Sequence, residues 1–153
     1  MIRNKRVLSA QDKHKLTAAI ERAEHSWLSD VPHLDVFRSV VRRHPAVRMA
    51  DVPADVITMN SRFILENVIT GESGLYELAY PHDAAIEQHR ISVLSPPGMA
   101  LIGGRVGEEL CWASAAGPTV AKVLRIIHQP EAAMRSDCAV STKRNDALLF
   151  SRN

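Results

Sequence analysis

Residues 91–112, ISVLSPPGMALIGGRVGEELCW, constrain the fold of this chain more than any other stretch of its sequence. An apolar strand pattern leads into a Ser-Pro-Pro-Gly turn, because two prolines and a glycine favour a stiff change of direction. A short helix is expected near residues 99–103, and a second strand at 109–113 follows a glycine-containing turn. This order of strand, helix and strand is typical of a small α+β domain.

The regions on both sides of this segment carry further strand patterns, separated by glycine-bearing loops and proline turns. About five strands and one small helix predict an α+β domain with a mostly antiparallel sheet. We place its beginning at the polar, proline-containing link of residues 51–55. The expected strands lie at residues 56–59, 63–68, 75–80, 91–94, 109–113 and 119–128.

The first fifty residues predict two short helices. Ser9 is a good N-cap, and Asp12 three residues later is favoured by the helix dipole and by reciprocal capping. Residues of the expected first helix form an apolar stripe along one face, with helical spacing. The stripe consists of Leu16, Ile20, Ala23 and Trp27.

The expected second helix begins after a break at residues 29–32, where Pro32 suits a first helical turn. Apolar residues repeat at helical spacing from Leu34 to Val41. The run ends at His44 because a residue that precedes proline avoids the α region. Two helices with complementary apolar stripes predict an N-terminal antiparallel helical hairpin, a short coiled coil, over residues 1–50.

Charge is divided unevenly along the chain. Residues 1–50 hold ten Lys/Arg against five Asp/Glu, a balance of +5, whereas residues 51–132 hold five against ten, a balance of −5. This asymmetry indicates that the two parts face different partners. A basic hairpin would attract nucleic-acid phosphates in a salt-dependent way, although a solvated helical surface explains the same composition.

The sequence also limits the class of protein. No apolar run approaches the roughly 20 residues that cross a bilayer, and a cytoplasmic location is expected. Cys111 and Cys138 lack the spacing of a zinc or redox pair, and Cys111 is expected to be a reduced, half-buried thiol. His82 and His89 are expected to be solvent-exposed rather than metal ligands. Because no P-loop, Rossmann or metalloprotease pattern occurs, we expect no enzyme activity, no cofactor and no metal.

Three motifs of this chain resemble those of the Gre-type family of bacterial transcription elongation factors, and in particular its Rnk branch. They are MNSR at residues 59–62, ISVLSPPGMALIGGRVG at 91–107 and QPEA at 129–132. The resemblance implies an FKBP-like C-terminal domain over residues 51–132. The polar residues that follow, 133–153, are expected to form a mobile tail. Two residues depart from the family pattern, namely Gly104 and Glu108.

The resemblance implies that the partner is RNA polymerase, and that the chain acts as a monomer. In Gre factors the C-terminal domain docks on the rim of the polymerase secondary channel. A long coiled coil enters that channel, and adjacent acids at its tip help to hold a catalytic magnesium. Here a first helix of about 17 residues would extend only about 25 Å, and the tip carries no adjacent acidic pair. We therefore expect modulation of transcription elongation without RNA cleavage.

Candidate contact residues come from the same resemblance, and each has a structural alternative. Prolines and a glycine set a stiff turn in any protein, and an acid near a helix start is favoured as a cap or by the dipole. The docking candidates are Ser95, Pro96, Pro97 and Gly98, and the hairpin-tip candidates are Asp30, His33 and Asp35.

Two other functions stay open at this point. The tip acids would stimulate transcript cleavage if they reached the polymerase active site, because metal-assisted hydrolysis needs carboxylates close to the metal. The Rnk name, regulator of nucleoside diphosphate kinase, implies instead a direct or indirect effect on that kinase.

Overall fold

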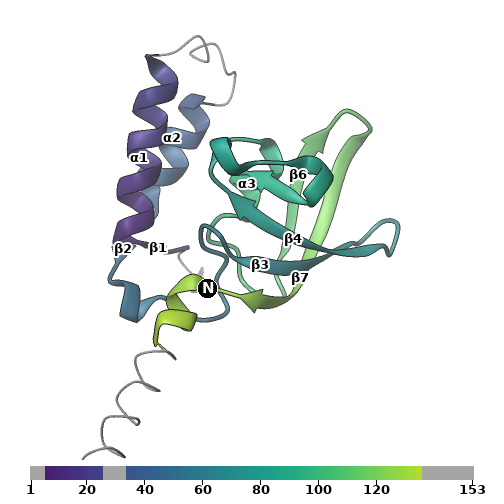
Figure 1. Cartoon of the computed structure of the whole chain (residues 1–153). Coiled ribbons are helices and arrows are strands. Elements are labelled where there is room, and N and C mark those ends of the chain that lie inside the picture. Colours follow the sequence, from purple (N-terminus) through teal and green to yellow (C-terminus); the bar gives the residue numbers. More distant parts are fainter. Residues whose placement is uncertain (1–5, 26–33, 136–153) are drawn as a thin grey trace, which may run out of the picture.

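The computed structural model describes residues 6–25 and 34–135. Two helices, α1 (Ala10–Glu24) and α2 (Leu34–Arg43), lie side by side and stand next to a curled sheet (Figure 1). The chain is therefore a mixed α+β protein, as the sequence predicts. Within the described ranges, no helix is both long and apolar enough to cross a membrane.

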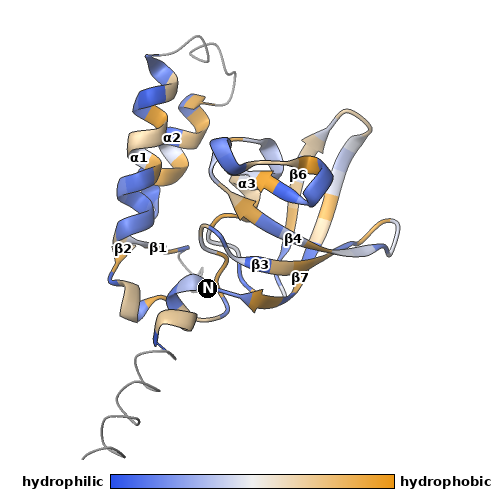
Figure 2. Ribbon diagram, in the orientation of Figure 1, coloured by the Kyte–Doolittle hydropathy of each residue, from blue (hydrophilic) through white to orange (hydrophobic). Residues whose placement is uncertain are grey.

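Helix α1 begins as the sequence predicts. Ser9 is its N-cap, and the Ser9 hydroxyl accepts a hydrogen bond of 3.0 Å from the Asp12 N–H. Leu16, Ile20 and Ala23 are buried on one face, and the alternating colours along α1 in Figure 2 show this amphipathic pattern. The fourth residue of the predicted stripe, Trp27, lies outside the described residues.

Helix α2 contributes the facing apolar side chains. Leu34, Phe37 and Val41 are buried, and Phe37 has no exposed surface. They belong to one hydrophobic core with the apolar face of α1 and the inner face of the sheet. A short parallel pairing of β1 (Leu8–Ser9) with β2 (Ala46–Val47) closes the base of the helix pair, and the sequence does not predict it.

The sheet has five strands in the order β5-β4-β3-β7-β6, and β4 with β5 is its parallel pair. Two short 3-10 turns, η3 (Pro81–Asp83) and η4 (Ile86–Gln88), connect β4 to β5, and a third, η2 (Met49–Asp51), precedes the sheet. Helix α3 (Pro96–Leu101) packs near β6 (Figure 1). The strands are β3 (Arg62–Asn67), β4 (Ser73–Ala79), β5 (Arg90–Ser92), β6 (Glu109–Ser114) and β7 (Gly117–His128).

Three local predictions are wrong. The strand expected at 56–59 is absent, since Val56 forms only an isolated bridge with Arg105 and the following residues turn. The short helix begins at Pro96 rather than near residue 99, because Ser95 caps it and proline suits its first turn. Cys111 is exposed rather than half-buried, because strand alternation turns it outward while Leu110 faces the core.

Candidate functional site

The turn that carries the docking candidates is built around helix α3. Ser95 is the N-cap, and its hydroxyl accepts a hydrogen bond of 3.3 Å from the Gly98 N–H. Pro96 and Pro97 follow in the first turn of α3 and are partly exposed, whereas Gly98 is buried. Only the serine and the prolines therefore offer side-chain surface to a partner.

Gly98 has a structural reason of its own. A Cβ atom at this position would lie 1.9 Å from the Ser92 carbonyl oxygen and 2.7 Å from the Val93 Cα. Both are backbone atoms, so no rotation of a side chain relieves the overlap. The close approach of α3 to the end of β5 thus requires glycine.

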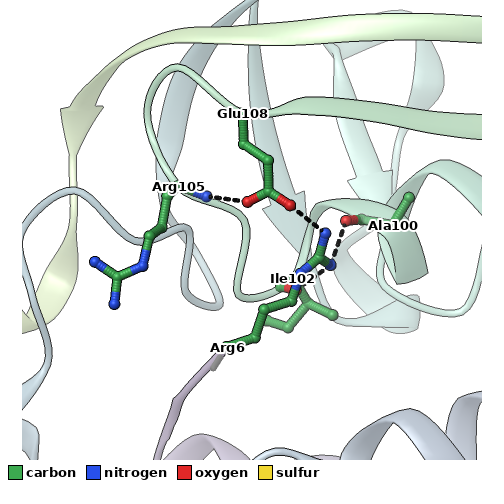
Figure 3. Close-up of polar contacts among 5 residues, drawn as sticks. All are labelled: Arg6, Ala100, Ile102, Arg105 and Glu108. Carbon is green, nitrogen blue, oxygen red and sulfur yellow. Dashed lines mark hydrogen bonds and ion pairs between the residues drawn. The ribbon is translucent and has the colours of Figure 1, made fainter. Parts of the chain in front are cut away.

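Arg6 ties the N-terminal segment to the far end of the same helix (Figure 3). Its Nη1 donates hydrogen bonds to the Ala100 carbonyl at 2.9 Å and to the Ile102 carbonyl at 3.3 Å. Its Nη2 donates to Glu108 Oε1 at 2.7 Å. The positive charge therefore lies at the C-terminal end of α3, where free carbonyls favour a cation.

Glu108 has two partners in this arrangement. Its Oε1 accepts the hydrogen bond from Arg6 Nη2, and its Oε2 accepts a hydrogen bond of 3.1 Å from the Arg105 N–H (Figure 3). The Glu108 carboxylate therefore joins the turn before β6 to the N-terminal segment. We call Arg6 and Glu108 the latch.

The latch leads to a prediction about stability. Arg6→Ala is expected to lower the free energy of unfolding by about 1 to 2 kcal/mol, because three partly buried hydrogen bonds are lost. Urea unfolding followed by circular dichroism measures this change. Arg125→Ala on the exposed sheet surface is the matched control and is expected to change stability by less than about 0.5 kcal/mol. Equal effects of the two substitutions would show that the latch contributes nothing.

A second polar cluster lies at the base of α1, where the first and last family motifs meet. The Thr58 hydroxyl donates a hydrogen bond of 2.7 Å to Glu131 Oε2 and lies 2.9 Å from the Ser61 hydroxyl. Asp12 Oδ2 accepts a hydrogen bond of 3.2 Å from the Met59 N–H. All four polar side chains are buried, so α1, the MNSR segment and the QPEA segment are joined by interior hydrogen bonds.

The charges of this cluster perturb each other. Burial, and next the neighbouring Glu131 carboxylate, raise the pKa of Asp12 from 3.8 to about 6, against the opposing effect of hydrogen bonds from Met59 and Ser9. Burial and the Asp12 carboxylate also raise the pKa of the Tyr80 hydroxyl above its ordinary value. Asp12, predicted as a first-turn acid, is thus also an interior carboxyl group.

The QPEA segment contributes a further link. Gln129 Nε2 donates two hydrogen bonds of 2.7 Å, one to the Pro53 carbonyl and one to the Val56 carbonyl. Residues 130–135 are helical and follow directly after β7. The motif therefore joins the end of β7 to residues 53–56, which precede the first strand of the sheet.

The structure places one of the three hairpin-tip candidates. Asp35 lies in the first turn of α2 with 93% of its side chain exposed, and its Oδ1 is 3.2 Å from Arg38 Nη1. Arg38 also pairs with Glu24, which links α2 to α1. Asp30 and His33 lie outside the described residues. An acid in the first turn of a helix is favoured by the helix dipole, so the position of Asp35 agrees with a purely structural role as well as with a functional one.

Sequence reasoning missed the latch and the interior cluster as sites. Arg6 lies 102 residues before its partner Glu108, and Thr58 lies 73 residues before Glu131. The available signals were the departure at Glu108 and two polar motifs, MNSR and QPEA, that lie at the two ends of the sheet region.

These features define a protein with a helix pair fixed to a mostly antiparallel sheet. Residues 52–128 match the family described as "Transcription elongation factor, GreA/GreB, C-term". The chain therefore belongs to the GreA/GreB family of transcription elongation factors, and the predicted resemblance is confirmed.

Particular relatives make the relationship more specific. The chain is 31% identical over 128 residues to the "Regulator of nucleoside diphosphate kinase" of Escherichia coli (strain K12). The matched region covers 83% of this chain and 92% of that protein. It is also 39% identical over 56 residues to "Transcription elongation factor GreA" of Syntrophus aciditrophicus (strain SB). That match covers 37% of this chain and 35% of the GreA protein.

A solved structure supports the fold. The "Prokaryotic transcription elongation factor GreA/GreB from Nitrosomonas europaea" superimposes with a TM-score of 0.68 and 25% identity. The match covers 82% of this chain and 100% of that one. Similarity therefore extends through most of the chain.

Proposed function

We propose that this chain docks on RNA polymerase at the rim of the secondary channel and modulates elongation without RNA cleavage. Membership of the GreA/GreB family supports the polymerase as partner. The observation that carries the proposal is the shortness of the two helices within the described residues 6–25 and 34–135. Helix α1 has 15 residues and α2 has 10, which correspond to about 22 Å and about 15 Å.

The length of the helices limits how far the tip acids can reach toward the active site of the polymerase. Metal-assisted hydrolysis needs carboxylates within a few ångströms of the metal and of the attacking water. In the sequence, the expected tip region offers Asp30 and Asp35, which are not adjacent, and Asp35 lies in the first turn of α2. Asp35 is moreover paired with Arg38. These features favour occupation of the channel entrance over assistance to cleavage.

In this proposal residues 51–132 dock and residues 1–50 act. The partly exposed Pro96 and Pro97 at the start of α3 give the docking surface. Arg6 holds the other end of α3 through the Ala100 carbonyl. A partner seated on α3 would therefore hold the base of the helix pair in a fixed direction.

Charge removal at the tip is the test. Asp30→Asn and Asp35→Asn are expected to leave polymerase affinity within about twofold of wild type, because distant sites behave additively. The effect on elongation is expected to change, since the tip charge is lost while an asparagine still caps a helix. Fluorescence anisotropy with labelled protein measures binding, and single-round elongation assays measure the effect.

The alanine variants are the control for capping. Asp30→Ala and Asp35→Ala remove both the charge and any capping oxygen, at a cost of about 1 kcal/mol where a cap is lost. If the asparagine variants behave like wild type in elongation and only the alanine variants fail, the acids are structural and the proposed role of the tip is wrong.

The name of the Escherichia coli relative favours a second candidate, direct regulation of nucleoside diphosphate kinase. Direct regulation requires association with the kinase itself. A titration of purified kinase with this protein, read out by both association and phosphotransfer rate, tests it. Absence of both effects would remove the direct route.

A further inference from the structure

Helix α1 and the corner after β4 enclose an open cleft of about 620 Å³, whose lining includes neither the latch nor the docking candidates at residues 95–98. One wall is the face of α1 that carries Lys15, Ala19 and Arg22, and the other includes Asn60, His82 and Leu94. Clefts of this size are in the range that holds small-molecule ligands. Its two walls come from parts of the chain far apart in the sequence.

The helical wall presents two cations, of which Lys15 also acts electrostatically on the Asp12 carboxylate. Lys15 and Arg22 are seven residues apart on one face of α1, about 10 Å along the helix axis. Both are exposed, and neither forms a hydrogen bond or ion pair with another residue in the described part of the chain. Ala19 lies between them, so the two charges flank a small apolar surface.

The opposite wall offers the Asn60 amide as a neutral donor, and its acid, Asp83, already has a partner. Asn60 has a left-handed backbone with φ of 64°, and its N–H donates to the Leu78 carbonyl at 2.7 Å. Its side-chain amide makes no hydrogen bond to another described residue. Asp83 also lines this wall, and its Oδ2 lies 3.1 Å from His82 Nε2. Both asparagine and glycine can adopt the left-handed backbone of residue 60. Asparagine also supplies a side-chain amide that can donate hydrogen bonds, which glycine cannot.

We propose that this cleft binds a small organic phosphate of nucleotide size, with its phosphates on Lys15 and Arg22 and its body on Ala19 and Leu94. An arginine fork and a lysine ammonium are both suited to phosphate oxygens. The Asn60 amide donates to the same ligand from the other wall. The test of this proposal needs no polymerase.

Isothermal titration calorimetry of the full chain at low salt tests the proposal with ATP, pyrophosphate and adenosine as probes. We expect saturable ATP binding with a Kd below about 1 mM. Pyrophosphate is expected to bind more weakly because it does not contact the apolar surface, and adenosine more weakly still because it has no phosphate. Adenosine binding as tight as ATP binding would overturn the proposal, as would no saturable ATP binding at about 10 mM.

Two variants of equal charge change locate the site. Lys15→Gln/Arg22→Gln is expected to weaken ATP binding about tenfold or more, because each charge-assisted contact is lost. Lys122→Gln/Arg125→Gln alters exposed cations on β7 and is expected to leave the Kd unchanged. Equal losses in both variants would show non-specific attraction and contradict a site in the cleft.

Asn60→Gly separates the backbone role from the amide role. Glycine adopts the left-handed conformation readily, so folding is expected to be retained. ATP affinity is expected to fall severalfold because one donor is lost. An unchanged affinity in this variant, with folding verified by circular dichroism, would remove Asn60 from the proposed site.

Discussion

Gly98→Ala is expected to destabilise the protein by about 3 kcal/mol or more, or to prevent its folding. The added Cβ would lie 1.9 Å from the Ser92 carbonyl oxygen, and the obstructing atoms belong to the backbone. Relief would require α3 to move away from the end of β5, which exposes the buried Leu101 of α3. The free energy of unfolding in urea, or the yield of folded protein, measures the effect.

Gly107→Ala is the matched control. Gly107 has φ of +89°, and a Cβ there would meet no atom within 4 Å. Its replacement therefore costs only backbone strain, on the order of 1 kcal/mol. If the two alanine variants had equal stability, the close approach at Gly98 would not exist in solution.

The Gly98 substitution also affects the turn at residues 95–98, which we propose as the docking surface. Loss of polymerase binding in Gly98→Ala would report a misplaced helix rather than a lost contact. Pro96→Ala and Pro97→Ala change the exposed surface without filling the space at Gly98. The proline variants are thus the ones that test contact with a partner.

Asp12→Asn is expected to raise the free energy of unfolding relative to wild type more at pH 8 than at pH 4. The difference between the two pH values is expected to reach up to about 3 kcal/mol. The folded-state pKa of Asp12, about 6, is above its unfolded value of 3.8. The folded protein therefore holds this proton more tightly than the unfolded chain. The resulting stability is fully present below pH 3.8 and is lost as the pH rises through about 6.

The charges around Asp12 determine what the substitution changes. Glu131 and the Tyr80 hydroxyl face it from the sheet region, and Lys15 lies on its own helix. Asparagine keeps an oxygen that can accept the Met59 N–H and removes the charge that Glu131 repels. The stability difference between variant and wild type is therefore expected to grow from pH 4 to pH 8.

Urea unfolding of both proteins across this pH range measures the difference. Asp55→Asn is the control, because Asp55 is half exposed and pairs with Arg105 at 3.6 Å. Its pH profile is expected to follow wild type closely at pH values above about 6. Parallel profiles for Asp12→Asn and wild type would show that Asp12 does not bind its proton more tightly when folded.

The helices and most strands could be predicted because their signals are local. Ser9, Leu16 and Phe37 carry capping and periodicity information within a few residues of the chain. The segment at 56–59 shows the limit of this reasoning. Its apolar residues resemble a strand, yet they are buried in a turn whose hydrogen bond joins the Thr58 N–H to the Ser61 hydroxyl.

The sites were harder to predict because they depend on distant contacts. The charge of Arg6 is visible in the sequence, but its partners on α3 lie 94 and 96 residues away. Asp12 is an ordinary first-turn acid until the MNSR and QPEA segments bury it. The motifs therefore predicted the family better than they predicted what their own side chains contact.

The most direct test of polymerase docking without cleavage uses core RNA polymerase stalled on a backtracked transcript. We expect the protein to bind these complexes, to be displaced by excess Gre factor, and to leave the transcript length unchanged. Failure to bind at low salt would contradict docking. The appearance of shortened transcripts that are lost with Asp35→Ala would contradict the absence of cleavage.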